Sequence, residues 1–316
     1  MAAIDAQVST GLAGLDRVFR GIMAGDNIVW QVDGIDDYVP LVEPFCQYAR
    51  SRGRKLVYFH FARHPALVDE GPGVEVQVLD PGEGFEPFLT AIHKTIEQTG
   101  RGAYYVFDCL SDLVADWYSD QMLGNFFMLT CPYLYDLETV AYFALLRGHH
   151  SFHATAPIID TTQLFSDVYR HQDELYVRPL KVQQRYSPTM YMLHVWRGEE
   201  FTPVADSITI SEILTRFPWS GLKANDPRLD IWNRTFLEAE QVVEAERDNV
   251  HVDELVRDLL QHTLRMTVSR DERVIRLAEK VLTLSDILAI KQRMIGTGLI
   301  GGKAVGVLLA RAILKR

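Results

Sequence analysis

The chain has 316 residues and contains few of the features that mark several large classes of protein. It has three cysteines, and no two of them form a CxxC pair. Because Cys46, Cys109 and Cys131 all lie in apolar segments, we expect reduced, buried thiols and a cytoplasmic location. A disulfide framework is excluded as the source of stability.

Long apolar runs and excess positive charge are also missing. No segment reaches the ~18 uncharged apolar residues of a membrane span, and the amino-terminal residues lack the basic and apolar regions of a signal peptide. Lysine and arginine total 32 against 42 acidic residues, a net charge of -10. The cluster Arg50 to Lys55 falls in an expected solvated turn, so we expect no nucleic-acid and no membrane partner.

What remains is the composition of a globular protein, 47% hydrophobic and 23% charged, in a chain longer than one typical domain. The composition changes near Asp206, after which helical patterns with alternating charge follow, such as FLEAEQVVEAERDNV. We therefore predict a domain over residues 1–205, a helical linker over 206–273 and a separate segment over 274–316.

The most informative stretch is Gly25 to Arg63. Ile28 to Val32 is a short apolar run, Pro40 to Arg50 has apolar residues close to a helical face, and a second apolar run follows from Leu56 to Phe61. This pattern predicts a strand, a helix and a second strand. Near-continuous apolar strands are typical of a parallel sheet covered on both faces, so the fold class is α/β.

The pattern of strand and helix repeats further along the chain. Val74 to Leu79 alternates as a strand does, and Phe88 to Thr99 has the spacing of a helix. Leu137 to Leu146 fits either a strand or a buried helix. We expect a mostly parallel sheet flanked by helices, followed by a carboxyl-terminal helical segment.

The lead-in STGLAGLDRVF, Ser9 to Phe19, together with Gly25 to Arg63, resembles the opening of a RecA/KaiC-like P-loop ATPase. The phosphate loop of such a protein, GxxxxGK[ST], needs glycines, a lysine and a hydroxyl residue to hold phosphates and Mg²⁺. The positions of the first glycine, the second glycine, the lysine and the hydroxyl residue are held here by Val32, Asp37, Tyr38 and Val39. The loop is degenerate.

Negative charge further disfavours a triphosphate at this loop. Asp33, Asp36 and Asp37 place three carboxylates within five residues, which repel one another by roughly several kcal/mol per pair. Ala62 and Arg63 stand where the resemblance implies a catalytic glutamate pair. We therefore expect no catalytic residue, no resident metal and no ATP in this chain.

Asp108 ends the apolar strand within AYYVFDCLSDL and resembles the metal-supporting aspartate of the family. The resemblance implies a vestigial Mg²⁺ site, and a helix cap is the alternative. The segments Ile158 to Tyr169, Glu174 to Arg185 and Pro188 to Trp196 resemble its late strands and closing hairpin. In oligomeric members of the family, basic residues that match Lys181 and Arg185 reach the nucleotide of a neighbouring subunit. Here we expect these two residues to be surface charges of the hairpin. A homo-oligomer remains an open alternative.

The segment GHHSFH contains His149, His150 and His153. A metal site would need further ligands, and no acidic or cysteine residue lies close in the sequence. We expect these histidines at the surface or at a sheet edge.

A second resemblance covers Val274 to Leu314, which is similar to the start of the PEP/pyruvate-binding ATP-grasp domain of PEP synthase and pyruvate phosphate dikinase. Its Gly301, Gly302 and Lys303 match a glycine-lysine signature at the start of a helix. The resemblance implies an ATP contact at these residues in a complete ATP-grasp domain only. It also implies ATP and Mg²⁺ as cofactors of a full-length product, and downstream ATP-grasp and phosphohistidine domains as partners in that protein.

Three functions follow from these observations. The first is a non-catalytic RecA/KaiC-like regulatory or assembly module at the amino terminus of a PEP synthase-like phosphotransferase. The second is an atypical nucleotide-binding ATPase that uses Asp108, with Arg63 or Lys181 replacing the missing lysine. The third is a sensor that holds a small uncharged or cationic ligand at the acidic loop.

Overall fold

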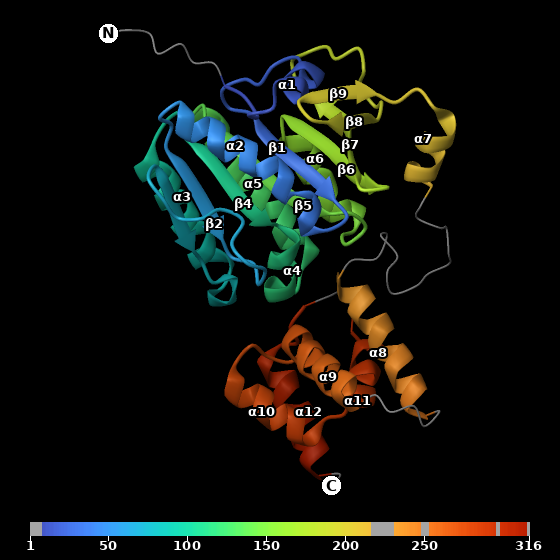
Figure 1. Ribbon diagram of the computed structural model, residues 1–316. Coiled ribbons are helices and arrows are strands. Elements are labelled where there is room, and N and C mark those ends of the chain that lie inside the picture. The colour runs from blue at the N-terminus through green and yellow to red at the C-terminus, as the bar shows by residue number, and fades with distance from the viewer. Residues whose placement is uncertain (1–7, 216–230, 248–252, 295–297, 315–316) are drawn as a thin grey trace. The chain divides into compact units, whose positions relative to one another are not determined.

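The computed structural model describes residues 8–215, 231–247, 253–294 and 298–314. The chain divides into two compact units, Met1–Trp219 and Ser220–Arg316, which are described separately (Figure 1). The division falls later than the boundary expected at 205/206. Helix α7 (Ser207–Leu214) belongs to the first unit because its Ile213 is buried against Tyr169 and Leu193.

A nine-stranded sheet in the order β3-β2-β4-β5-β1-β6-β7-β8-β9 forms the centre of the first unit. In this order, the first six strands, β3 through β6, pair in parallel with their neighbours. The last three pairs, from β6 through β9, are antiparallel. The strands are β1 (Asn27–Val32), β2 (Leu56–His60), β3 (Val74–Val78), β4 (Tyr104–Cys109), β5 (Val140–Leu146), β6 (Leu164–His171), β7 (Glu174–Val182), β8 (His194–Arg197) and β9 (Glu200–Pro203). The prediction of an α/β fold with a mostly parallel sheet is confirmed.

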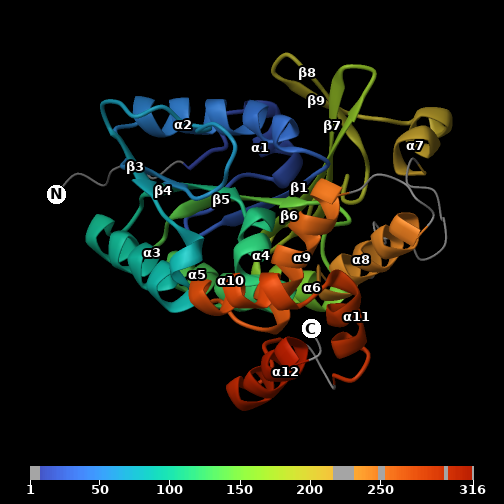
Figure 2. The same ribbon diagram turned by 90° about the horizontal axis from the view of Figure 1, so that it is seen from below.

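Helices cover both faces of this sheet. Figure 2 shows α1 and α2 on one face and α3, α5 and α6 on the other. The helices are α1 (Ala13–Phe19), α2 (Val39–Ser51), α3 (Phe85–Thr99), α4 (Ser111–Trp117), α5 (Asp120–Asp136) and α6 (Phe152–Thr161), with short 3-10 helices η1 (Ile35–Asp37) and η2 (Pro81–Glu83). The strand-helix-strand unit expected over Gly25 to Arg63 is present as β1, α2 and β2.

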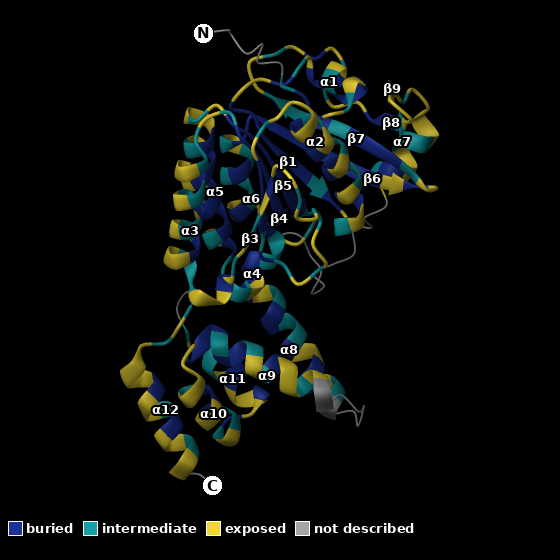
Figure 3. Ribbon diagram, turned by 60° about the vertical axis from the view of Figure 1, so that its left-hand side comes forward, coloured by how far each residue is buried: buried dark blue, intermediate teal, exposed yellow. Residues whose placement is uncertain are grey.

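Strand β5 shows why the sheet is apolar throughout. Successive side chains point to opposite faces, so Tyr142 stacks on Phe45 of α2 with ring centroids 3.9 Å apart, while Phe143 stacks on Phe107 at 4.3 Å and meets Phe127 of α5 at 5.0 Å. Figure 3 shows the strands buried beneath helices whose outer faces are exposed. Cover on both faces explains why the run Leu137 to Leu146, which fitted two structures, contains a buried strand.

One expected strand begins later than predicted. We expected a strand over Ile158 to Tyr169, but the first four residues of this segment, up to Thr161, end helix α6. Strand β6 begins only at Leu164. The hydroxyl of Thr162 donates to the backbone oxygens of Asn27 and Leu164 at 2.7 and 3.0 Å. These bonds join the end of α6 to the start of β1 and β6.

The described part of the second unit is helical. Its helices are α8 (Ile231–Arg247), α9 (Asp253–Thr267), α10 (Glu272–Val281), α11 (Leu284–Lys291) and α12 (Gly302–Leu314). Helix α9 packs against α8, α10 and α11, and α10 packs against α12. Segments expected as a linker and as a separate domain start therefore share one bundle. Among the described residues of both units, no helix combines the length and apolar character that crossing a membrane requires.

Burial of His194 in β8 predicts how stability depends on pH. The side chain is almost fully buried, and burial lowers its pKa below the ordinary value because the charged imidazole loses its hydration. Below pH ~6.5 the unfolded chain takes up this proton before the folded protein does, so stability present above that pH is lost as the pH falls.

We expect His194→Leu to reduce the loss of unfolding free energy between pH 8 and pH 5, measured by urea denaturation at each pH. His153→Gln, at an exposed position, is the control and should retain the wild-type dependence. An unchanged dependence in His194→Leu would contradict the prediction.

Candidate functional site

The carboxyl ends of the six parallel strands meet at one edge of the sheet. Asp33 follows β1, His60 ends β2, Asp108 lies at the end of β4 and Arg147 follows β5. The helix after β1 covers one face and the helix after β5 covers the other (Figure 2). Open parallel sheets bind ligands where neighbouring strands send their connections to opposite faces. This rule points to the carboxyl ends of β1 and β5 as the position of a candidate site.

Tyr38 fills the position at which the family resemblance places a lysine. Its side chain is fully buried, and its hydroxyl donates to the backbone oxygen of Phe107 at 3.3 Å. Burial raises the pKa of Tyr38 well above the ordinary value, so the phenol stays neutral. The loop therefore has a neutral side chain directed into the core where a phosphate site needs a cation.

The acidic loop is not the unpaired cluster expected from the sequence. Nε of Arg147 donates to Asp33 at 2.8 Å, and Nε of Arg170 donates to Asp37 at 2.7 Å. Asp36 is exposed, and its backbone oxygen accepts from Nη2 of Arg170 at 3.2 Å. The expected repulsion among the three carboxylates is offset because Arg147, which follows β5, and Arg170, in β6, reach the loop.

Arg147 also bridges the carboxyl ends of β1 and β6. Its Nη1 donates to Asp167 at 2.6 Å, and its Nη2 donates to the backbone oxygens of Gln31 and Val168 at 3.1 and 2.8 Å. The guanidinium carbon lies 4.0 Å from the ring centroid of Tyr169. With its side chain 12% exposed, Arg147 binds the protein itself where a ligand would enter.

Asp108 is fully buried and accepts several hydrogen bonds. Its donors are the Tyr58 hydroxyl and the amides of Phe61 and Ala62, at 2.8 and 2.9 Å for the two amides. Two histidines also lie beside the carboxylate. Nδ1 of His60 is 2.7 Å from it, and Nε2 of His64 is 3.7 Å from it.

These contacts leave the expected vestigial Mg²⁺ site without open oxygens. Among residues 8–215, 231–247, 253–294 and 298–314, no group of three or more histidine, cysteine or acidic residues is arranged to hold a metal. The alternative of a helix cap is wrong, because Leu110 is the N-cap of α4 and no side chain caps it. Asp108 instead joins the ends of β2 and β4.

His153 is exposed, as the surface alternative expected, whereas His150 is buried at the sheet edge between β5 and α6. Nε2 of His150 lies 2.6 Å from the Ser111 hydroxyl, and Nδ1 lies 3.6 Å from Oδ1 of Asp120. The amide of Leu146 donates to the same hydroxyl at 2.9 Å. Sequence reasoning missed this group because its members are 30 or more residues from His150 along the chain.

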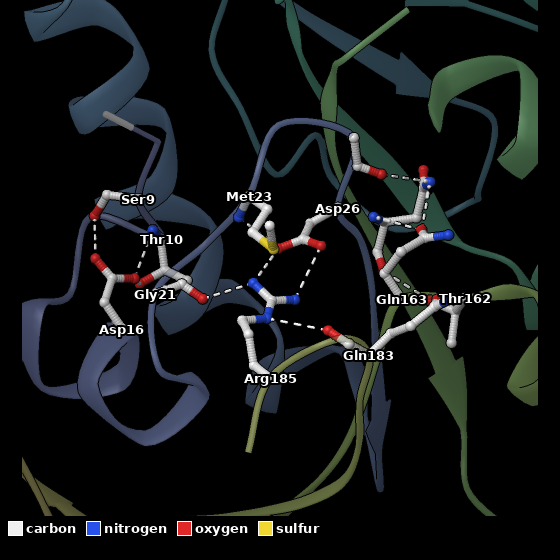
Figure 4. Close-up of polar contacts among 12 residues, drawn as sticks. Ser9, Thr10, Asp16, Gly21, Met23, Asp26, Thr162, Gln163, Gln183 and Arg185 are labelled. Atoms are coloured by element: carbon white, nitrogen blue, oxygen red, sulfur yellow. Dashed lines mark hydrogen bonds and ion pairs between the residues drawn. The ribbon is translucent and has the colours of Figure 1, made fainter. Parts of the chain in front are cut away.

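Arg185 is not the expected surface charge. Its guanidinium donates to both carboxylate oxygens of Asp26, at 2.8 and 3.0 Å, and the Arg185 side chain is 8% exposed (Figure 4). Lys181 donates to the backbone oxygens of Ile159 and Asp160 at the end of α6. Because Asp26 precedes β1, the Arg185 pair lies at the opposite edge of the sheet from Asp108.

In the second unit, Gly301, Gly302 and Lys303 are exposed at the start of α12. The backbone oxygen of Gly301 accepts from the amide of Ala304 at 2.9 Å, as in an ordinary first helical turn. Val305 and Leu309 are buried on the other side of this helix. The lysine expected to contact ATP is thus presented to solvent.

No protein-family model matches this chain, and no curated protein matches it either. The chemistry of the sheet edge therefore has to be deduced from its contacts.

The network around Asp108 predicts a large effect of its removal on stability. We expect Asp108→Ala to lower the unfolding free energy by about 3–5 kcal/mol, because two buried amides and the Tyr58 hydroxyl lose their acceptor. The measurement is urea denaturation followed by circular dichroism. Asp36→Ala, at an exposed loop position, should change stability by less than ~0.5 kcal/mol. Equal effects in the two variants would show that Asp108 does not hold β2 and β4 together.

Proposed function

We propose that the first unit is a RecA/KaiC-like module that neither binds nor hydrolyses nucleotide, and that it regulates or assembles a PEP synthase-like phosphotransferase. The position of Asp108 supports the RecA/KaiC-like assignment, since it ends a parallel strand at the same edge as the β1 loop. Strand β5 lies between β1 and β4, so the loop and Asp108 face a common edge without being neighbours.

The observation that carries the proposal is that side chains of the protein itself occupy the loop position at which a nucleotide phosphate would bind. Tyr38 enters the core at the lysine position, and Arg147 bridges Asp33 and Asp167. A triphosphate would have to displace these buried contacts and would meet the released carboxylates. The Arg147–Asp167 pair is largely buried, with side chains 12% and 6% exposed, so removing Arg147 from it would be costly, which disfavours a bound triphosphate.

The atypical-ATPase alternative needs a cation near the loop that is available to phosphate. Arg63 is 93% exposed on its side chain and lies 3.9 Å from Asp116. Lys181 is bound to carbonyls of α6, as described above. Neither replaces the missing lysine, because β4 and β5 separate β2, which Arg63 follows, from the β1 loop, and Lys181 is bound to carbonyls. The sensor alternative needs unpaired acids, and Asp33 and Asp37 are both paired with arginines.

The role in assembly is supported by the surface of α12. Val307 and Leu314 are 69% and 86% exposed, and Ile313 is 48% exposed. A helix that leaves such side chains in water is suited to packing against a further domain. An ATP-grasp domain continuing from this helix is the partner that the resemblance of Val274 to Leu314 implies.

We expect calorimetric titration of the 316-residue chain with ATP and Mg²⁺ to show no saturable site of micromolar affinity, because the loop has no lysine and the arginines that reach it are paired with Asp33 and Asp37. Lys303→Ala is titrated in parallel, so that weak binding at α12 is distinguished from binding at the loop. A stoichiometric site that survives this substitution and maps to residues 33–39 would favour the atypical ATPase.

A second expected outcome concerns Lys303 in a polypeptide with a complete ATP-grasp domain. Lys303→Ala should lower ATP-dependent phosphotransfer to pyruvate by roughly tenfold or more, because a charge-assisted contact to phosphate is lost. Arg311→Ala, at an exposed position of the same helix, is the control. An active protein in which Lys303→Ala leaves turnover and ATP affinity unchanged would show that the ATP-grasp assignment is wrong.

A further inference from the structure

Ser111, His150 and Asp120 form a separate group of polar side chains in the first unit. Ser111 is the first residue of α4, directly after β4, and Asp120 is the first residue of α5. His150 lies between β5 and α6. Three different connections therefore bring a hydroxyl, an imidazole and a carboxylate together.

The order of contacts is that of a nucleophile, a base and a group that orients the base. The hydroxyl of Ser111 lies 2.6 Å from Nε2 of His150, within hydrogen-bond reach. The other ring nitrogen, Nδ1, lies 3.6 Å from Oδ1 of Asp120. Separations of this kind often exceed hydrogen-bond length without substrate and shorten in the complex.

Two buried atoms without hydrogen bonds give the group a second, independent feature. Nδ1 of His150 and Oδ1 of Asp120 are buried, and neither has a hydrogen-bond partner. Oδ2 of Asp120 accepts from the amide of Ser151 at 3.1 Å, which fixes the carboxylate beside the ring. Unsatisfied buried polar atoms are costly, and the two atoms face each other. A small displacement would join them.

The burial of the three residues also differs in the way that this chemistry requires. The side chains of His150 and Asp120 are 2% and 3% exposed, so the imidazole and the carboxylate are shielded from bulk solvent. Ser111 is partly exposed at the sheet edge. A reagent from solvent therefore meets the hydroxyl first.

We propose that Ser111, His150 and Asp120 form a nucleophilic site for acyl transfer, with an activated carboxylic ester as the substrate class. This inference goes beyond the proposed function and does not depend on it. Ser111 and His150 are the catalytic residues, and Asp120 is a positioning residue. The arrangement matches the roles, not the fold, of serine hydrolases.

Each step balances with water as the only co-reactant. The Ser111 oxygen forms a bond to the ester carbonyl carbon while its proton passes to Nε2 of His150. The carbon–oxygen bond to the leaving alcohol then breaks, and the alcohol takes that proton. Water attacks the acyl-serine, gives one proton to Nε2 and releases the carboxylic acid as Ser111 takes the proton back.

The test is labelling of the 316-residue chain with an alkyl fluorophosphonate, followed by mass spectrometry of the peptides. We expect one phosphonylated serine, Ser111. His150→Gln should slow labelling by ~100-fold or more, because the base is lost. Ser207, exposed at the start of α7, is the internal control and should stay unlabelled. A folded protein whose Ser111 is unmodified, or is modified equally fast in His150→Gln, overturns the proposal.

Asp120 is tested by a pair of variants that keep its size or its charge. In Asp120→Asn the oxygen that accepts from the Ser151 amide is retained, so the fold is preserved while the carboxylate is lost. We expect labelling to slow at least tenfold in Asp120→Asn and to recover in part in Asp120→Glu. Equal labelling in Asp120→Asn and wild type would show that Asp120 does not position His150. Addition of imidazole to His150→Ala should restore labelling if the ring acts as the base.

Discussion

A single arginine holds the sheet edge together. Arg147 follows β5 and donates to Asp33, Asp167 and two backbone oxygens, so one largely buried guanidinium connects the end of β1 to β6. A buried charge is tolerated only when it is paired and hydrogen-bonded. The carboxyl end of β1 is therefore occupied by contacts within the protein.

The same principle governs Asp108. A carboxylate at this depth requires donors, and Tyr58, His60 and two amides supply them. Groups suited to ligands or metals are thereby used to join strands. In the Ser111 group, Nδ1 of His150 and Oδ1 of Asp120 are left without hydrogen-bond partners. Nε2 of His64, beside Asp108, is also without a hydrogen-bond partner. What sets the Ser111 group apart is a partly exposed hydroxyl that lies 2.6 Å from the buried imidazole of His150.

Some of this could be deduced from the sequence by itself. Apolar runs at Ile28 to Val32 and Leu56 to Phe61 determined buried parallel strands, since only a sheet covered on both faces accepts them. Because Tyr38 stands at the lysine position of the phosphate-loop pattern, the sequence alone shows that this lysine is missing. The helical spacing from Phe88 to Thr99 determined α3 to within a turn. These are local properties of short segments.

Only the tertiary structure decided how the polar residues are used. Asp33 pairs with Arg147, 114 residues away, and His150 meets Ser111, 39 residues away, so neither contact leaves a local pattern. The sequence placed Arg185 on the surface, whereas the hairpin folds its guanidinium onto Asp26. Strand order decides which side chains share an edge, and that order is set by packing between distant segments, which no window of the sequence contains.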